Sequence, residues 1–410
     1  MKQVERDGGR SHMKRQGRWG LAALALLLAL PGCGSPQAEP SEPGETSGVQ
    51  QEQETAPGSV PEAPEDPTHF YEEVQENLLI DAEVTGPPEG VVPKVYEGIM
   101  KSFTKEEIDA FLAWNGDAVA EITWDGEQDQ SYVYSGTCQS GSIFGMDVSL
   151  NGLYPMTSSY KNIDKNERFS SYPIYSTQMM YERDRSHYIA ELFTEPEDMS
   201  FATAEEAEAE VREALETLHL GELKLNRTLY ISHTRMEKAG EILQGEEWTR
   251  MGKGGGEVTY PQWDDWDETD DCYLFEFFSS ADGIPMTHRE WDGTTVSYCP
   301  NSIVVWYTGD GIVCLSVLYP WTFGKIVEEP ERIVSAGDAL LVAREKYANI
   351  ISTQSRVIEK VELTYVYEQD GDGWVLRPVW EVVIRQKASE MIPFDTFSYV
   401  RVDAVTGEEM

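Results

Sequence analysis

The carboxylates best suited to binding a metal ion lie in one short segment. Residues 263–271, Trp-Asp-Asp-Trp-Asp-Glu-Thr-Asp-Asp, place six carboxylates in nine positions. Calcium takes six to eight oxygen ligands, but this segment lacks the Asp-x-Asp-x-Asp-Gly spacing that wraps one ion. We therefore interpret it as a solvated acidic loop ahead of a strand at Tyr273. Calcium binding is the alternative, and we assign no metal ligand.

The residues that commonly carry catalysis do not form a recognisable set. None of the six histidines stands in a His-Glu-x-x-His pair or at ligand spacing from a cysteine; they are His12, His69, His187, His219, His233 and His288. There is no Gly-x-Ser-x-Gly elbow, and the Gly-rich stretch 252–256 opens no helix. Among 73 acidic residues, any chosen carboxylate pair is uninformative. We assign no catalytic residue and no cofactor, and expect the protein not to be an enzyme.

Four of the five cysteines could form disulfides. They allow three complete pairings and are Cys138, Cys272, Cys299 and Cys314. In the simplest register of a hairpin turning at Gly309-Asp310, Cys314 faces Val305, so Cys299 and Cys314 are not natural partners. An exported chain can form disulfides, whereas an anaerobic host would leave the thiols reduced. Both states stay open.

The fifth cysteine, Cys33, follows a pattern typical of export. Lys14, Arg15 and Arg18 precede the uncharged run Gly20–Leu30. A membrane span needs roughly 20 apolar residues, so this run is too short to cross and instead fits a signal peptide. Residues 1–32 are therefore predicted to be a signal peptide. Met13, followed by two basic residues, looks like a natural start of the chain.

Leu30-Pro31-Gly32-Cys33 resembles the bacterial lipobox. In that motif a peptidase cuts before a cysteine that carries thioether-linked diacylglycerol. The resemblance implies lipid attachment at Cys33 and a chain held on the outer side of the cell membrane.

The segment after Cys33 has the composition of a flexible tether. Residues 34–68 contain seven prolines and eight acids with no Lys or Arg, which cannot build a core. We predict that residues 33–68 form a lipidated cysteine and a disordered acidic tether. A flexible chain of this length spans about 30 Å root-mean-square.

The charge of the chain excludes one class of partner. The formal net charge is −41, and such a surface repels the phosphate backbone of nucleic acids. Removing residues 1–32, with six cations and two acids, leaves 32 − 6 = 26 cations against 73 − 2 = 71 acids, or −45. With 40% hydrophobic residues, most of the mature chain should fold.

Three segments have the pattern of a helix start followed by an apolar face. Thr203-Ala-Glu-Glu206 is typical of a capping box, and Gly221 is placed to end the helix. Its apolar face comprises Ala207, Val211, Ala214, Leu215 and Leu218. Ser335 and Thr104 begin two further segments of this kind. Aligning the starts at Thr203 and Ser335 gives a weak internal repeat.

Alternating patterns predict strands after the two longer helices. Tyr273–Phe278 and a hairpin of Ile303–Tyr307 with Ile312–Tyr319 follow the first. A strand around Val361–Tyr367, another around Leu376–Ile384 and a last one, Tyr399–Val405, follow the second. Pro378 indicates an edge or a bulge, Trp380 is predicted in the core, and Trp374 is expected to stack on an edge.

The folded part should contain several compact units. About 340 residues remain, more than a single core usually supports. We predict an α+β fold with antiparallel sheets, each covered by a helix, in two or more domains. The predicted units are a β-rich region at 69–200, an α+β domain at 201–332 and a last domain at 333–410.

The last domain resembles a PepSY-type module. The resemblance rests on a helix, two strands with Val-Glu-Leu-Thr-Tyr and Arg-Pro-Val-Trp-Glu-Val, and the closing Asp403-Ala-Val-Thr-Gly407 turn. The whole chain is similar to large lipoproteins of clostridial gut bacteria, a family of unknown function. PepSY modules imply secreted or envelope proteins that bind peptidases or regulate membrane sensors, and they supply no catalytic residue.

Together these patterns predict a lipid-anchored binding or regulatory module of the cell envelope. Its partners would be the membrane and an envelope protein or peptide. We expect Glu362, Thr364, Val366 and the strand edge near Pro378 to be open to an extended partner. A hydrolase acting on cell-wall or carbohydrate polymers and a structural surface lipoprotein are the alternatives.

Overall fold

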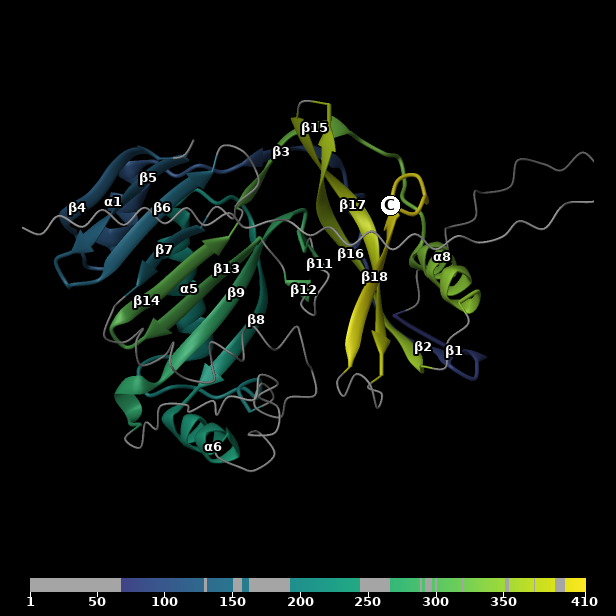
Figure 1. Ribbon diagram of the computed structural model, residues 1–410, viewed down its shortest axis with the longest axis horizontal. Coiled ribbons are helices and arrows are strands. Elements are labelled where there is room, and N and C mark those ends of the chain that lie inside the picture. The colour runs from purple at the N-terminus through teal and green to yellow at the C-terminus, as the bar shows by residue number, and fades with distance from the viewer. Residues whose placement is uncertain are drawn as a thin grey trace, which may run out of the picture. The chain divides into compact units, whose positions relative to one another are not determined.

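The protein is described here by a computed structural model, which is mixed α+β as predicted (Figure 1). It describes residues 68–128, 131–149, 157–161, 192–243, 266–287, 290–291, 297–298, 301–318, 320–350, 354–371, 373–387 and 395–410. All of these belong to one compact unit, residues 63–410. The predicted signal peptide, Cys33 and the predicted tether up to residue 67 lie outside the described residues.

Four α-helices occur in the described part: α1 (Lys105–Trp114), α5 (Ala204–Glu216), α6 (His233–Leu243) and α8 (Ala336–Ala348). Thr104, Thr203 and Ser335 cap α1, α5 and α8, and each forms a full capping box with the acid three residues later. The three predicted starts are therefore confirmed. Helix α5 ends at Glu216, before Gly221, because a turn with His219 at φ 51° intervenes.

One sheet has seven strands in the order β1-β2-β16-β17-β3-β15, with β18 also paired to β17. The strands are β1 (His69–Gln75), β2 (Leu78–Thr85), β3 (Val95–Met100), β15 (Trp321–Glu328), β16 (Arg356–Asp370), β17 (Gly373–Gln386) and β18 (Thr396–Asp403). Strands β2 and β16 run parallel and the other neighbours antiparallel. Helix α8 packs on β16, β17 and β18 (Figure 1).

The other large sheet has nine strands in the order β10-β9-β13-β14-β7-β6-β5-β4, with β8 also paired to β9. The strands are β4 (Val119–Gln128), β5 (Ser131–Cys138), β6 (Ile143–Ser149), β7 (Thr157–Lys161), β8 (Leu223–Ile231), β9 (Cys272–Ala281), β10 (Ile284–Pro285), β13 (Ser302–Thr308) and β14 (Gly311–Leu318). A small hairpin joins β11 (Glu290–Trp291) to β12 (Ser297–Tyr298).

Strand β9 is buried on both faces, because helices pack on each. Its alternate residues Tyr273, Phe275 and Phe277 pack in a core with α1 and α5. Cys272 and Leu274, on the other face, pack in a second core with Met236 and Ala239 of α6. All ten residues of β9 are buried as a result, so a strand predicted from its hydrophobicity is central to the nine-stranded sheet.

The two large sheets are joined through buried contacts around β10. Met286 forms a β-bridge with Tyr365 of β16. The Thr364 hydroxyl donates to the Pro285 carbonyl at 2.9 Å and accepts from the Thr287 amide at 2.8 Å. Thr364 is fully buried. Because these bonds are shielded from water, they tie β16 firmly to the nine-stranded sheet.

The predicted domain limits do not separate the sheets. Strands β1, β2 and β3, from the predicted region 69–200, belong to the same sheet as β16, β17 and β18 from the predicted domain 333–410. Strand β15, from the predicted domain 201–332, forms an end of that sheet. The C-terminal segment therefore depends on strands from two earlier parts of the chain, and long-range pairing of this kind leaves no mark in local sequence patterns.

Two local predictions about strands also need correction. Strand β17 is central rather than an edge, and Pro378 falls where its neighbour changes from β3, paired at Val375 and Leu376, to β18, which begins pairing at Val379. A proline without an N–H is tolerated at that gap. Cys314 lies opposite Trp306 rather than Val305, because a bulge after Trp306 shifts the hairpin by one residue.

Candidate functional site

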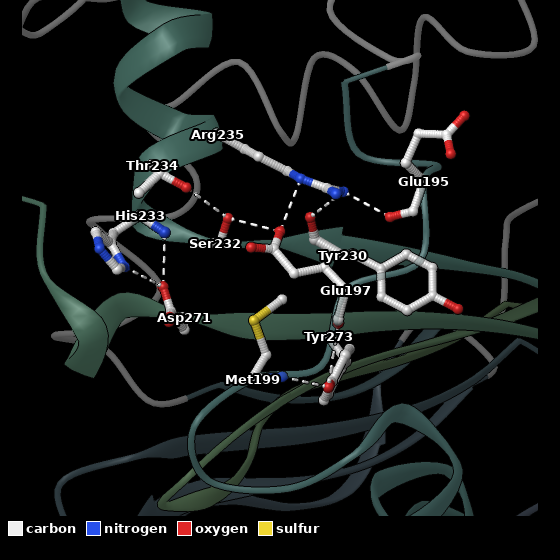
Figure 2. A network of polar contacts seen from close by, with 10 residues as sticks. All are labelled: Glu195, Glu197, Met199, Tyr230, Ser232, His233, Thr234, Arg235, Asp271 and Tyr273. Carbon is white, nitrogen blue, oxygen red and sulfur yellow. Dashed lines mark hydrogen bonds and ion pairs between the residues drawn. The ribbon is translucent and has the colours of Figure 1, made fainter.

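Side chains of the types used by hydrolases meet where β8 leads into α6 (Figure 2). Ser232 follows β8, His233 begins α6, Asp271 precedes β9, and Glu197 lies in the segment before α5. A serine hydrolase would need the hydroxyl to hydrogen-bond the imidazole, and the imidazole to hydrogen-bond an acid. The hydrogen bonds in this network test that arrangement.

The imidazole of His233 has the acid partner that a catalytic dyad requires. Its Nδ1 lies 2.8 Å from Oδ1 of Asp271, whose side chain is only 6% exposed. The same oxygen accepts the backbone N–H of His233 at 2.6 Å. The hydrogen bond that the imidazole donates to Asp271 raises the pKa of His233, and partial burial acts in the opposite direction. Asp271 therefore both caps the first turn of α6 and favours the imidazolium form.

The hydroxyl of Ser232 is engaged elsewhere. It donates to Oε2 of Glu197 at 3.0 Å and lies 3.1 Å from the Thr234 hydroxyl. In Figure 2 the His233 ring lies on the side of Asp271, away from this hydroxyl. The serine and the histidine thus contact two different carboxylates, and no histidine of the described residues is positioned to take the proton of this hydroxyl.

Glu197 is in turn held by Arg235. The Nε of Arg235 lies 2.8 Å from Oε2 of Glu197, and its Nη1 donates to the carbonyls of Glu195 and Tyr230 at 2.8 and 3.2 Å. Five donors in a fixed geometry suit arginine to bridging several oxygens at once. The guanidinium therefore fixes the 195–197 segment against the end of β8.

Tyr273 extends the same network beneath Glu197 (Figure 2). Its hydroxyl accepts the Met199 N–H at 2.8 Å and donates to the Ala202 carbonyl at 2.9 Å. Burial raises the pKa of Tyr273, so the hydroxyl stays protonated and able to donate. The network as a whole anchors α6 and residues 195–202 to strands β8 and β9.

A second cluster surrounds Glu107 at the start of α1. Its carboxylate accepts from the Thr104 amide at 2.8 Å, pairs with the Lys101 ammonium, and lies 2.9 Å from Nδ1 of His219. Burial acts to raise the pKa of Glu107, but these hydrogen bonds outweigh it and lower the pKa to about 2. An acid that stays ionised with three donors is a structural anchor joining α1, the end of β3 and the turn after α5.

Three of the four described carboxylates of the acidic segment 263–271 cap backbone groups, and Asp270 and Asp271 are buried rather than solvated as predicted. Asp267 accepts the Thr269 amide at 2.8 Å, Asp270 accepts the Asp267 amide at 3.1 Å, and Asp271 holds α6. Asp264 and Asp265 lie outside the described residues. Within the described ranges, no group of three or more His, Cys, Asp or Glu side chains could hold a metal ion.

The histidines and cysteines give few further candidates. Each described histidine lies against a carboxylate, since His69 contacts Asp81 at 2.9 Å in addition to the two pairs above. Cys138, Cys272 and Cys314 are buried thiols. Burial, with Asp117 nearby, raises the pKa of Cys138 to about 12, so it is a poor nucleophile. His12, His187, His288 and Cys299 lie outside the described residues.

The docking surface predicted for residues 333–410 is not open. Glu362, Thr364 and Val366 are 9%, 0% and 1% exposed, because both faces of β16 are covered rather than one. Trp380 is fully buried as predicted, and Trp374 is 37% exposed and packs edge-on against Trp321. An extended partner cannot reach the face of β16 that the alternation suggested.

The Asp403–Gly407 motif, from which a PepSY-type module was predicted, has a structural role. The Asp403 carboxylate accepts the amides of Val405 and Thr406 at 2.7 and 3.0 Å, and Gly407 has φ 79°. The turn places the Ala404 carbonyl to accept the Val334 amide at 2.8 Å. The Asp-Ala-Val-Thr-Gly sequence therefore closes β18 against the residue before the α8 cap.

The sequence did not predict the network at α6, because the start of this helix has no local capping motif. The position three residues after Ser232 is Arg235, not an acid, so no capping box marks α6. The acid that caps it, Asp271, is 38 residues from His233. The one available signal was Ser232, a residue type favoured before helices, directly after an alternating strand.

Comparison with known proteins gives a likeness of fold. No family model matches this chain, and no curated protein sequence matches it. A crystal structure at 1.45 Å resolution of an uncharacterized protein from Eubacterium rectale ATCC 33656 is similar, with a TM-score of 0.55 and 16% sequence identity. The match covers 84% of this chain and 93% of that chain. In the described parts of the present chain, no helix has the length and apolar character needed to span a membrane.

Proposed function

We propose that the protein is an outward-facing lipoprotein of the cell membrane whose folded part binds or regulates an envelope protein or peptide without catalysing a reaction. The anchor rests on the signal-like run Gly20–Leu30 and the adjoining Cys33. The PepSY-like order of elements in residues 333–410 supports a binding or regulatory role. No nucleic acid, metal or cofactor is part of this proposal.

One observation supports a function without catalysis: the serine and the histidine of the hydrolase-like cluster contact two different carboxylates. Ser232 donates to Glu197, and His233 pairs with Asp271, which also holds the helix backbone. A nucleophile is activated by a base that can accept its proton. These side chains instead stabilise the junction of β8, β9 and α6, so they support a surface rather than a reaction.

Lipidation is tested by detergent partitioning of the exported chain. The wild-type protein should enter the detergent phase, and Cys33→Ala should remain in the aqueous phase. Pro31→Ala, which keeps the cysteine, is the matched control and should partition like wild type. Equal partitioning of the wild type and Cys33→Ala would contradict the anchor.

Catalysis is tested with peptidoglycan, glycans and peptides as substrates. We expect no turnover by the purified protein, and no difference between wild type and Ser232→Ala. Hydrolysis that Ser232→Ala abolishes while the circular dichroism spectrum stays unchanged would contradict the proposal and favour a hydrolase. Deleting residues 333–410 is unsuitable for such tests, because β16 and β17 lie between β2 and β3 in one sheet.

A further inference from the structure

Strand β1 ends the seven-stranded sheet with a regular, open edge. It pairs with β2 on one side and has no neighbour on the other in the described strand order. The Val84 amide donates to the Thr68 carbonyl at 2.9 Å, and in an antiparallel pair the residues bonded to the partner strand alternate with residues that are not. His69, Tyr71 and Glu73 therefore direct their backbone N–H and C=O groups away from β2, toward the open side.

The edges of β15 and β4 are less suited to receive another strand. Each has two register shifts along its pairing with its neighbour, whereas the shift in β1 comes only after Glu73. Bulges break the regular spacing that an added strand needs. In β4 the indole N–H of Trp124 also donates to the Gly126 carbonyl at 3.1 Å. Of these three edges, β1 has the most regular one.

Helix α8 borders one face of the β1 edge (Figure 1). On that face the Arg344 guanidinium lies 2.6 Å from the Glu72 carboxylate, and a Cβ placed on Gly337 would lie 3.6 Å from the Phe70 ring. Leu341 is one turn after Gly337, so it lies on the same side of α8, and it is 51% exposed. A strand added beside β1 would therefore meet an apolar side chain on this face.

The opposite face of the β1 edge is acidic. His69, Tyr71 and Glu73 alternate with the residues that face α8, so their side chains lie on this other face. Strand β2 adds Asp81 and Glu83, which pair with Tyr71 and His69. Three exposed carboxylates thus lie near one histidine, which contacts Asp81 at 2.9 Å. An added strand fits this edge when its side chains are cationic on this face and apolar on the face of α8.

We propose that the edge of β1 binds an extended cationic segment of an envelope partner, which joins the seven-stranded sheet as a strand with apolar side chains toward α8 and Lys or Arg on the opposite face. This inference rests on the proposed binding function and gives it a surface. Main-chain hydrogen bonds supply affinity in such strand addition, and the alternate side chains supply specificity. The net charge of −41 also favours a cationic partner over an acidic one.

A proline in the edge tests the main-chain hydrogen bonds. A fluorescently labelled Lys-Val-Lys-Val-Lys-Val-Lys peptide is titrated with the intact protein in detergent, and binding is followed by anisotropy. Tyr71→Pro removes an N–H that points away from β2, a position at which an edge strand tolerates proline. Tyr71→Ala is the matched control, because it removes the same side chain and keeps the N–H. The proline variant should bind about tenfold more weakly than the alanine variant.

Modified peptides test the same bonds on the wild-type protein. In the proposed pairing the lysine amides point toward β1 and the valine amides point away. N-methylation of the lysine amides should therefore weaken binding about tenfold, whereas N-methylation of the valine amides should leave it unchanged. A Glu-Val-Glu-Val-Glu-Val-Glu peptide should bind more weakly than the Lys-Val peptide, because it brings like charges together.

Hydrogen exchange locates the bound peptide, which should protect the amides of His69, Tyr71 and Glu73. Absence of binding, equal binding of the two methylated peptides, or unchanged exchange at these amides would overturn the β1 site and leave lipid anchoring untouched. Cleavage of a peptide that protects β1 would instead overturn the non-catalytic function and support the site.

Discussion

Helices α5 and α6 cover opposite faces of the nine-stranded sheet, and they begin in different ways. The start of α5 is closed locally, because Thr203 and Glu206 bond each other's backbone amides within one turn. The start of α6 is closed by Asp271, which lies directly before β9, a strand that α6 packs against. A local cap stabilises its helix alone, whereas a cap borrowed from a strand also fixes the helix in place. A hydrogen bond to the first turn of a helix therefore stabilises more of the structure when its acceptor belongs to another element.

Helix α1 combines both devices. Glu107 closes the local capping box with Thr104 and also contacts Lys101 and His219. The pKa of the capping glutamate is lowered more where tertiary donors add to the local ones. Hydrogen bonds from Thr203 alone lower the pKa of the exposed Glu206, whereas the additional donors lower that of Glu107 to about 2. We therefore expect the effect of removing each cap to grow with the number of tertiary partners.

Glu107→Gln should cause the largest loss of stability. The pKa falls from 4.5 to about 2 on folding, and each unit corresponds to about 1.4 kcal/mol, so the loss at pH 7 is at most about 3 kcal/mol. A lowered pKa contributes stability above pH 4.5 that disappears as the pH falls toward 2. Urea unfolding at pH 7 and pH 3 measures this. The neighbouring Glu106→Gln is the control, and an equal loss in both variants at pH 7 would contradict the role of the cluster.

Asp271→Asn should follow, with a loss of about 2 kcal/mol, since hydrogen bonds to charged groups contribute about 1.5–3 kcal/mol. The variant weakens the α6 cap and removes the ionic partner of His233 while keeping the side-chain shape. Amide hydrogen exchange should show faster exchange in α6 than in α5. Equal protection of both helices would mean that Asp271 does not hold α6.

Thr203→Ala tests the purely local cap. Losing an N-cap hydroxyl costs about 1 kcal/mol, and the loss should be confined to α5. Ser335→Ala in α8 is the matched variant, because its capping box has the same form. Urea unfolding should give similar losses for the two. A loss from Thr203→Ala that matched Asp271→Asn would remove the distinction between local and borrowed caps.

The same distinction explains how much of the fold was predictable. The capping boxes at Thr104, Thr203 and Ser335 lie within four consecutive residues each, so the sequence predicts them directly. The hairpin of β13 and β14 joins neighbours along the chain and was also predicted, apart from the bulge that moved Cys314. The pairing of β2 with β16 joins residues nearly 280 positions apart. No local pattern specifies such a pairing.

The candidate site was less predictable than the fold, for a related reason. Ser232, His233, Asp271 and Glu197 are ordinary polar residues in the sequence, and they meet only because β8 and β9 pair in register from Ile231 with Cys272 onward. The alternating pattern of β16 predicted only one of its two buried faces. Val361 and Leu363 lie in a core as the pattern indicates, but the burial of Glu362 and Thr364 depends on the elements that pack against the opposite face.

The smallest effect concerns the imidazole of His233 and depends on pH. The hydrogen bond to Asp271 raises the pKa of His233 in the folded protein above its unfolded value of 6.5. A raised pKa contributes stability that is complete below pH 6.5 and is lost as the pH rises through the folded-state pKa.

His233→Gln keeps a side-chain donor but cannot become charged. Wild type should therefore exceed this variant in unfolding free energy more at pH 5.5 than at pH 8.5. The control is His69→Gln, which removes an exposed histidine–carboxylate pair between β1 and β2 and leaves α6 unchanged. A difference between wild type and His233→Gln that stays constant across this range would show that Asp271 acts on α6 through the backbone amide alone.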